Sequence, residues 1–187
     1  MEKTITIGQS LKAIMGALIK ATANNGGKVS VNQSNVIAIK RGRFNPAEFI
    51  GKNSSINANE MDTRSTTLTE LDITKVKLVT MLRCGETYIN SADRLKRLKK
   101  KPGKIRLNAD IFLTLWENQH LIPESWKEKV NGKTHHIFFD GSSLKHSGLD
   151  RFHGFLCLYW NGSKWDHGVD WQVSGWTGIS SSAILAS

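Results

Sequence analysis

The sequence predicts an α+β protein, in which a basic part of helices and strands precedes a tryptophan-rich antiparallel β-meander. Three observations support this prediction. Apolar residues recur at helical spacing near the N-terminus, aromatic residues alternate around a turn signal near the C-terminus, and positive charge is concentrated in the first part. The chain has 187 residues, enough to bury a sizeable core in one domain or two small ones.

Composition excludes several classes of protein. Hydrophobic residues make up 39%, charged residues 22%, and there are three prolines, which excludes a disordered, collagen-like or coiled-coil chain. No apolar run approaches the ~20 residues of a membrane-spanning helix. Cys84 and Cys157 form no paired motif, which favours a reducing, cytoplasmic location. A secretory signal ending near Ala23 is the weaker alternative, because its apolar run is short and follows a helical period.

The first predicted elements alternate between helix and strand. An amphipathic stripe predicts a helix over residues 11–19, which residues 24–27 (Asn-Asn-Gly-Gly) stop. Strands are predicted over 29–31 and 36–40. Residues 45–48 (Asn-Pro-Ala-Glu) have the N-cap, proline and glutamate that begin a short helix.

The next segment is harder to interpret from local patterns. Residues 51–67 are polar and predict a loop. Residues 75–82 begin by alternating and predict a strand, although a helix started at Asp72 is an open alternative.

Two helices follow in the middle of the chain. The first is predicted to be capped by Ser91 and to run to about Lys100, ended by Pro102-Gly103. The second runs from an Asn108 cap to about Gln119, and we expect it to bury Phe112, Leu115 and Trp116.

The strongest local signal is Asn161-Gly162, because this pair suits the positive φ angles of a type I′ hairpin turn. A two-residue loop there places Ser163 opposite Trp160 and produces two faces. The predicted inward face holds Phe152, Leu156, Leu158 and Trp160 with Trp165, His167, Val169 and Trp171. The opposite face holds His153, Phe155, Cys157 and Tyr159 with Lys164, Asp166 and Asp170. A weaker hairpin turn is predicted at residues 139–142, so the meander spans about 134–173.

Charge is distributed unevenly along the chain. Residues 1–106 hold 20 Lys and Arg against 8 Asp and Glu, whereas residues 107–187 hold 6 against 8. All six tryptophans and all six histidines follow residue 115. The sequence therefore predicts two parts, 1–106 and 107–187, either as subdomains or packed as one domain, with the boundary near residues 99–104.

The basic excess includes one dense segment without any acidic residue. Lys and Arg that neutralise phosphates release counterions and give sequence-independent affinity for nucleic acid. The candidates for phosphate contact are Arg94, Lys96, Arg97, Lys99, Lys100, Lys101, Lys104 and Arg106, together with Lys40, Arg41 and Arg43. Nothing in the segment matches a base-reading helix, so we expect contacts with the backbone of DNA or RNA. The competing interpretation is an ordinary solvated charged helix.

Motifs for nucleotide hydrolysis, glycoside hydrolysis and serine hydrolysis are missing. Gly132-Lys133-Thr134 ends like a phosphate loop, but residue 127 is lysine where glycine is required. Asp166 and Asp170 lie about 13 Å apart along a strand, too far for a glycosidase pair. No Gly-x-Ser-x-Gly motif is present.

The sequence evidence for a histidine metal site or a histidine general base is weak, but it leaves both alternatives open. His135 and His136 are adjacent and point to opposite faces of a strand, so both cannot simply bind one metal ion. The predicted hairpin places His153 opposite Asp170, which suits a general base and equally an ordinary cross-strand ion pair. Among the tryptophans, Trp176 is predicted to be the exposed one and so a possible stacking platform. No catalytic residue, metal ligand or cofactor is assigned.

The C-terminal residues from Leu107 resemble the ends of hypothetical bacterial proteins. The resemblance covers about 80 residues. It lies in Leu115-Trp116, residues 121–126 (LIPESW), 138–141 (FFDG), 158–160 (LYW) and 182–186 (SAILA). It implies a reused bacterial unit and carries no activity.

Three functions are therefore considered. The leading hypothesis is a non-enzymatic nucleic-acid-binding protein that contacts phosphates through a basic helix and loop. The alternative is a protein-binding inhibitor or adaptor, for example a phage or mobile-element factor. The third is a metal-dependent enzyme that uses the histidine-rich part. None of the three involves a membrane.

Overall fold

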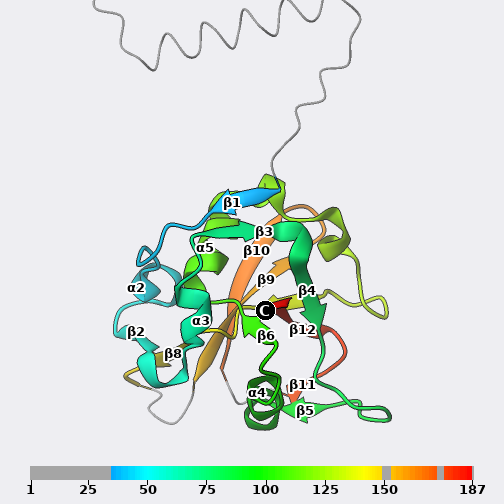
Figure 1. Cartoon of the computed structure of the whole chain (residues 1–187). Coiled ribbons are helices and arrows are strands. Elements are labelled where there is room, and N and C mark those ends of the chain that lie inside the picture. Colours follow the sequence, from blue (N-terminus) through cyan, green and yellow to red (C-terminus); the bar gives the residue numbers. More distant parts are fainter. Residues whose placement is uncertain (1–34, 149–152, 172–174, 187) are drawn as a thin grey trace, which may run out of the picture. The chain divides into compact units, whose positions relative to one another are not determined.

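The computed structural model describes residues 35–148, 153–171 and 175–186 (Figure 1). The helix predicted over 11–19 and the strand predicted over 29–31 lie outside these ranges. The described residues from Asn35 onward form one compact unit of helices and strands, and the α+β class is confirmed. None of the described helices is long and apolar enough to cross a membrane.

The described elements are mostly short. The strands are β1 (Val36–Ala38), β2 (Ser54–Asn57), β3 (Glu70–Asp72), β4 (Val76–Val79), β5 (Ile89–Asn90), β6 (Lys104–Arg106), β7 (His136–Phe138), β8 (Ser143–His146), β9 (Gly154–Trp160), β10 (Trp165–Trp171), β11 (Gly175–Trp176) and β12 (Ser180–Ala186). The α-helices are α2 (Pro46–Ile50), α3 (Thr63–Thr66), α4 (Ser91–Lys99) and α5 (Ala109–Glu117). Short 3₁₀ turns lie at Ala58–Glu60, Ile73–Lys75, Gln119–Leu121 and Glu124–Lys127.

The main sheet joins strands from both predicted parts of the chain. Its order is β2-β8-β9-β7-β12-β4, with β10 beside β9 and β6 beside β12. Strand β12 pairs antiparallel with β4 and β6 and parallel with β7, so one strand connects residues on either side of position 106. The predicted division at residue 106 is therefore not a boundary in the described structure.

The hairpin of β9 and β10 has the predicted faces but not the predicted register. Trp160 pairs with Trp165 instead of Ser163, so the loop has four residues. Gly162 has a positive φ of 102°, but Asn161 does not, and its side chain accepts hydrogen bonds from the backbone N–H groups of Ser163 and Lys164. Asn161 therefore closes the loop through its side chain. The type I′ prediction was wrong.

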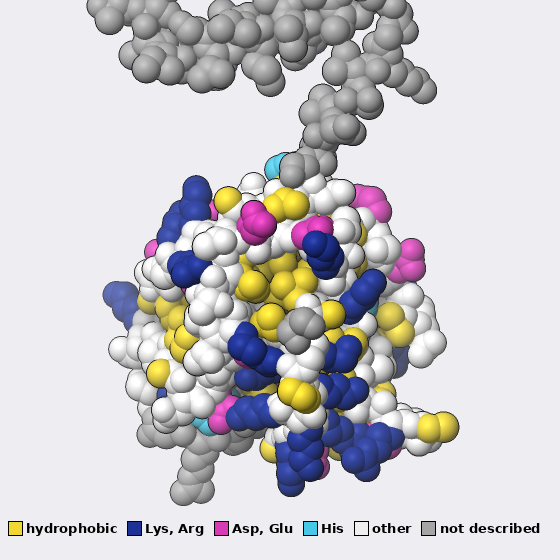
Figure 2. Space-filling view, viewed as in Figure 1, with side chains coloured by type: hydrophobic (Ala, Val, Ile, Leu, Met, Phe, Trp, Pro, Cys, Tyr) yellow, Lys and Arg dark blue, Asp and Glu magenta, His cyan; other side chains and the backbone are white. Residues whose placement is uncertain are grey.

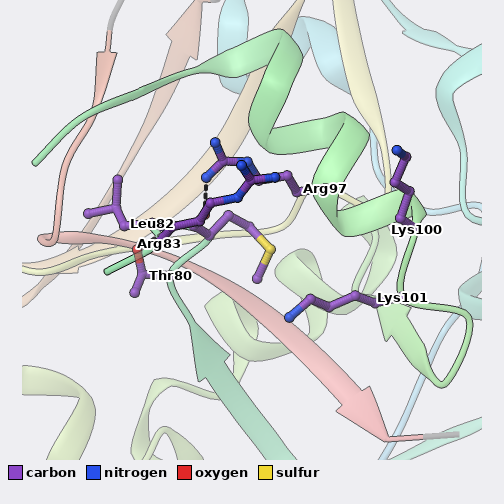
Figure 3. A pocket seen from close by; sticks show the side chains of 7 residues that line it. Thr80, Leu82, Arg83, Arg97, Lys100 and Lys101 are labelled. Carbon is purple, nitrogen blue, oxygen red and sulfur yellow. Dashed lines mark hydrogen bonds between the residues drawn. The ribbon is translucent and has the colours of Figure 1, made fainter. Parts of the chain in front are cut away.

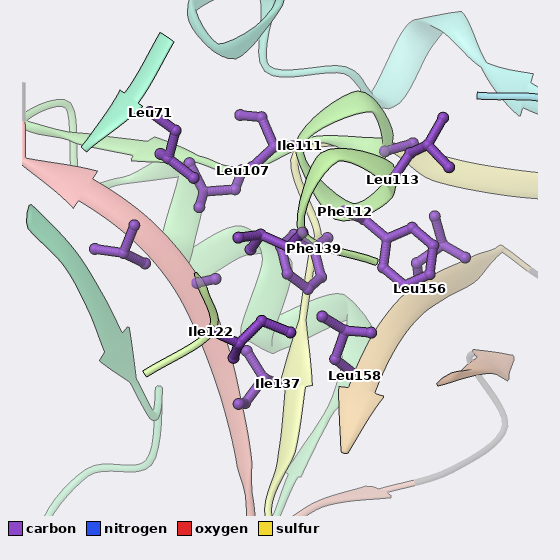
Figure 4. Packing of buried hydrophobic residues seen from close by; sticks show 14 of the residues in the cluster. Leu71, Leu107, Ile111, Phe112, Leu113, Ile122, Ile137, Phe139, Leu156 and Leu158 are labelled. Carbon is purple, nitrogen blue, oxygen red and sulfur yellow. The ribbon is translucent and has the colours of Figure 1, made fainter. Parts of the chain in front are cut away.

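The sheet is covered on both faces, which the sequence did not predict. Strand β7 shows the alternation: Ile137 points into a large core beneath α5, and Phe138 points into a second core beneath α4. We call these the main core and the second core. The main core holds Leu156, Leu158 and Trp165 of the predicted inward face (Figure 4). Phe155 and Cys157 of the predicted polar face are buried in the second core.

Local signals explain how several elements begin. Asn45 caps α2 by accepting from the N–H of Ala47, and its amide donates to Glu48, as the capping motif predicts. Asn108 caps α5 by accepting from the N–H of Ile111. The strand predicted after residue 75 is β4, and Asp72 caps only a 3₁₀ turn before it.

Three local predictions were wrong. Residues 51–67 contain β2 and α3 rather than only a loop, because β2 finds a distant partner in β8. No hairpin forms at 139–142, since β7 and β8 both pair with the same edge of β9. The N-cap of α4 is Asn90, which accepts from the N–H of Asp93, while the Ser91 hydroxyl accepts a hydrogen bond from Trp176.

His167 lies half-buried against the main core, in a setting that disfavours its charged form. Its ring packs against Trp116, Phe49 and Phe112 at centroid distances of 4.6, 5.2 and 6.1 Å. Burial lowers the pKa of His167 below its ordinary value of 6.5, and Asp166 offsets only part of this effect.

We expect this histidine to make stability decline in mild acid. Below pH 6.5 the unfolded chain binds a proton at this position that the folded chain does not bind, so stability falls as the pH decreases. Urea unfolding at about pH 7.5 and about pH 5.5 should show a smaller decline in the His167→Gln variant than in the natural protein. The exposed His120→Gln is the control. A decline of equal size in both variants would contradict the prediction.

Candidate nucleic-acid interface

One side of helix α4 is buried, and the opposite side exposes the lysines of the basic segment. Leu95 and Leu98 anchor it in the second core. Lys96, Lys99 and Lys100 are exposed on the outer side. The helix ends before Pro102-Gly103, which cannot continue it, and the chain then enters β6. Most of the predicted cations therefore do reach solvent.

Arg94 does not reach solvent, and its predicted role as a phosphate contact was wrong. It is 2% exposed, because its position lies on the same helix stripe as Leu95 and Leu98. Its guanidinium forms an ion pair with Asp140 at 2.8 Å and lies 3.2 Å from the centroid of the Trp176 ring. Burial lowers the pKa of Arg94 to about 10, while the Asp140 carboxylate opposes that shift.

Arg106 is the second predicted contact that the structure places inside. Its Nη1 donates to the Asp140 carbonyl oxygen at 2.6 Å, and its Nε lies 3.6 Å from the Asp62 carboxylate. The position is 5% exposed, on a strand that pairs with β12. Arg94 and Arg106 therefore organise the structure around Asp140 rather than bind a ligand.

Trp176 is also buried, so it is not the exposed stacking platform that its Gly/Ser-rich surroundings suggested. It is 1% exposed and packs against Phe138 at a centroid distance of 3.7 Å. Its Nε1 donates to the Ser91 hydroxyl at 2.7 Å, which ties the tryptophan to the first turn of α4. The pairing of β11 with β5 that brings it there is long-range and leaves no local sign.

Two further cations, the partly buried Arg97 and the exposed Lys99, are already paired. Arg97 donates to Glu86 at 2.8 Å and to the Met81 carbonyl, and this arginine holds the pKa of Glu86 well down, at about 2. Lys99 lies 2.6 Å from a carboxylate oxygen of Glu60. A phosphate at either position would have to compete with a carboxylate.

The remaining cations form a continuous basic region, which we call the α4 surface. Within the described ranges no carboxylate forms an ion pair with any of them. The α4 surface consists of Lys77, Arg83, Lys96, Lys100, Lys101 and Lys104. Figure 2 shows lysine and arginine side chains gathered over the part of this face where α4 and β6 lie.

A cavity of about 300 Å³ lies within the α4 surface (Figure 3). Arg83, Arg97, Lys100 and Lys101 line it, together with Thr80, Met81 and Leu82 from the end of β4 and the loop that follows. Arg83, Lys100 and Lys101 form no ion pair with a described carboxylate, so their N–H donors are suited to phosphate oxygens, whereas Arg97 is already paired with Glu86.

Residues 40–43 do not join the α4 surface. Their loop connects β1 and α2, at the top and left of Figure 1, whereas α4 lies at the bottom. Arg43 forms an ion pair with Glu117 at 2.9 Å, and Arg41 donates to the carbonyl oxygens of Thr67 and Leu68. The two basic clusters of the sequence are therefore on different sides.

Comparisons with family models, curated proteins and solved structures give no match for this chain. The resemblance of the C-terminal residues to hypothetical bacterial proteins stays a prediction, and function must be inferred from the residues themselves.

The histidine alternatives find little support in the geometry. Asp170 pairs with Phe155 rather than His153, because the hairpin register differs from the predicted one, and His153 lies 3.2 Å from the Asn57 amide. His135 lies 2.9 Å from the Ser181 hydroxyl. Among the residues that the structure describes, no three His, Cys, Asp or Glu side chains are grouped to hold a metal ion.

Two members of the α4 surface were missed from the sequence. Lys77 lies on β4 and pairs in register with Ile184, whose other neighbour is Arg106 of β6. Arg83 follows the same strand. Isolated basic residues in a strand carry no local sign of function, so only the sheet pairing could have placed them beside α4.

Proposed function

We propose that the protein binds nucleic acid through the phosphate backbone, using the α4 surface. The observation that supports this proposal most directly is the basic cavity beside α4. Arg83, Lys100 and Lys101 line it, and the side chains of these three residues form no ion pair with a described carboxylate, although Glu86 accepts from the Arg83 backbone N–H. Such contacts are independent of sequence and position the strand rather than read its bases. The free cysteines, Cys84 and Cys157, are consistent with action in the cytoplasm.

The proposal predicts a steep dependence of affinity on salt. Six phosphate contacts correspond to a slope of log affinity against log salt of about −4 to −5. Replacing Lys100 and Lys101 by glutamine should reduce that slope by about 1.5–2 and weaken binding at least tenfold in 0.1 M salt. Fluorescence anisotropy with labelled single-stranded and duplex DNA and RNA measures both quantities.

The matched control removes the same charge from another place. Lys40→Gln with Lys52→Gln changes two exposed lysines outside the α4 surface, and we expect the salt slope to stay as in the natural protein. Equal losses in both double variants would show that only net charge matters and would contradict a defined interface. No binding to any of the nucleic acids in about 50 mM salt would refute the proposed function.

The protein-binding alternative predicts a different result when the natural protein and the Lys100/Lys101 variant are used to recover partners from lysate. A partner recovered from lysate after nuclease treatment, by both the natural protein and the Lys100/Lys101 variant, would favour an adaptor. A partner lost on nuclease treatment favours nucleic-acid binding.

A further inference from the structure

A larger cavity lies on the same face of the sheet as α4, since its lining residues Phe138, Cys157 and Tyr159 belong to or pack against the second core. It has a volume of about 510 Å³, within the range of ligand sites. Its lining includes Cys157 and Tyr159 of β9, Gly168 and Asp170 of β10, and His136 of β7.

A third hollow of about 410 Å³ shares lining residues with both cavities. Leu82 lines both the basic cavity and the third hollow. Lys133, Thr177 and Ile179 line both the third hollow and the large cavity. The third hollow is therefore adjacent to both cavities, and we call the three together the groove. It carries cations at the α4 end, and the carboxylates of Glu86 and Asp170 line its middle and its far end.

The far end of the groove presents two rings, those of His136 and Tyr159, beside one lysine, Lys133, and one carboxylate, Asp170. The rings of His136 and Tyr159 pack side by side at a centroid distance of 5.0 Å, and both residues remain partly exposed. Burial lowers the pKa of His136, which keeps its ring neutral at neutral pH. Flat neutral rings are surfaces on which nucleic-acid bases stack.

Gly168 makes room for a flat ligand at this position. It lies opposite Cys157 in the hairpin register, and a β-carbon added there would meet the Cys157 sulfur at 3.6 Å and the Tyr159 ring at 3.8 Å. These are ordinary contacts, so a small side chain would fit and would occupy the cavity. Cys157 itself is not suited to covalent chemistry, because burial raises the pKa of its thiol to about 12.

We propose that the groove binds a single strand, with phosphates at the α4 surface and one or more bases against Tyr159 and His136. This inference rests on the proposed function and narrows it to unpaired DNA or RNA. A duplex keeps its bases stacked inside and offers none to the cavity, whereas a single strand turns them outward while its backbone follows the cations. Lys133, which lines the middle and the far end of the groove, supplies a further cation along that path.

The test compares an oligothymidylate of about 12 nucleotides with an abasic strand of equal length, within the roughly 4–16 nucleotides that single-strand-binding folds occupy. The abasic strand keeps the phosphates and lacks the bases. We expect the natural protein to bind the oligothymidylate about 10- to 100-fold more tightly than the abasic strand. Tyr159→Leu should remove most of that difference without changing the salt slope, while Tyr159→Phe should retain it.

A second variant keeps the test independent of the tyrosine. Gly168→Val fills the cavity from the opposite strand and should weaken oligothymidylate binding to a similar extent, while binding of the abasic strand stays the same. Equal affinity of the natural protein for both strands, or no effect of Tyr159→Leu and Gly168→Val, would overturn this inference and leave the proposed function intact. Failure to bind any strand or duplex would instead overturn the proposed function, and this inference with it.

Discussion

Replacing Asp140 by alanine is expected to lower the free energy of unfolding by about 3–5 kcal/mol, as is typical when one partner of a buried ion pair is removed. Asp140 is fully buried, and its carboxylate pairs with Arg94 at 2.8 Å and accepts from the Ser182 hydroxyl at 2.8 Å. The variant leaves the guanidinium of Arg94 in a buried position without a counter-ion. Urea unfolding followed by circular dichroism measures the loss.

Two control variants test whether the expected loss comes from leaving the buried Arg94 charge unpaired. Glu117→Ala breaks the exposed pair with Arg43 and should cost no more than about 1 kcal/mol. Arg94→Met combined with Asp140→Leu removes both buried charges, and we expect it to recover most of the stability that Asp140→Ala loses. A loss below about 1 kcal/mol for Asp140→Ala would contradict the role assigned to this pair.

Gly141→Ala is expected to destabilise the protein by about 3 kcal/mol or more. A β-carbon at this position would lie 2.3 Å from the carbonyl oxygen of Arg106 and 2.7 Å from that of Leu107. The neighbouring atoms are backbone and cannot rotate away. They also belong to an ordered junction, since Gly141 N–H donates to Leu107 and the Gly141 carbonyl accepts from Asp62, both at 2.8 Å.

Gly175→Ala is the matched control for that substitution. Its added β-carbon would lie even closer to a neighbour, 1.5 Å from the Tyr88 ring, but Tyr88 is 57% exposed and can change rotamer. We expect a cost within about 1 kcal/mol. Equal thermal stability of the two variants would contradict the prediction, because it would show that the backbone around Gly141 can move to accommodate a β-carbon.

Predictions from the sequence succeeded where the deciding contacts are local. The caps of α2 and α5 involve residues two or three positions apart, so Asn45 and Asn108 could be identified directly. The inward face of the β9–β10 hairpin was also correct although the register was not. The loop gained two residues, Ser163 and Lys164, both on the β10 side. A shift of two positions leaves every side chain on the same face of the strand.

Failures occurred where a distant partner decides the environment. Arg94 looks in the sequence like any other cation of its segment, yet Asp140 and Trp176 make it an interior residue. The pairing of β11 with β5 likewise buries Trp176, although the Gly/Ser-rich sequence around this residue predicted that it is exposed. For the candidate site, composition located the α4 end of the basic region, and only the sheet could add Lys77 and the cavity around Tyr159.

The central position of β12 has a consequence for how the protein is made. During synthesis, β4, β6 and β7 emerge from the ribosome before Ser180 is added, and until β12 arrives they have no strand to hold them together. A nascent chain at that stage carries unpaired strand edges beside a dense basic segment, and both attract other chains or polyanions. Assembly of the sheet, and with it the alignment of Lys77 and Lys104 on either side of β12, therefore waits for these late residues.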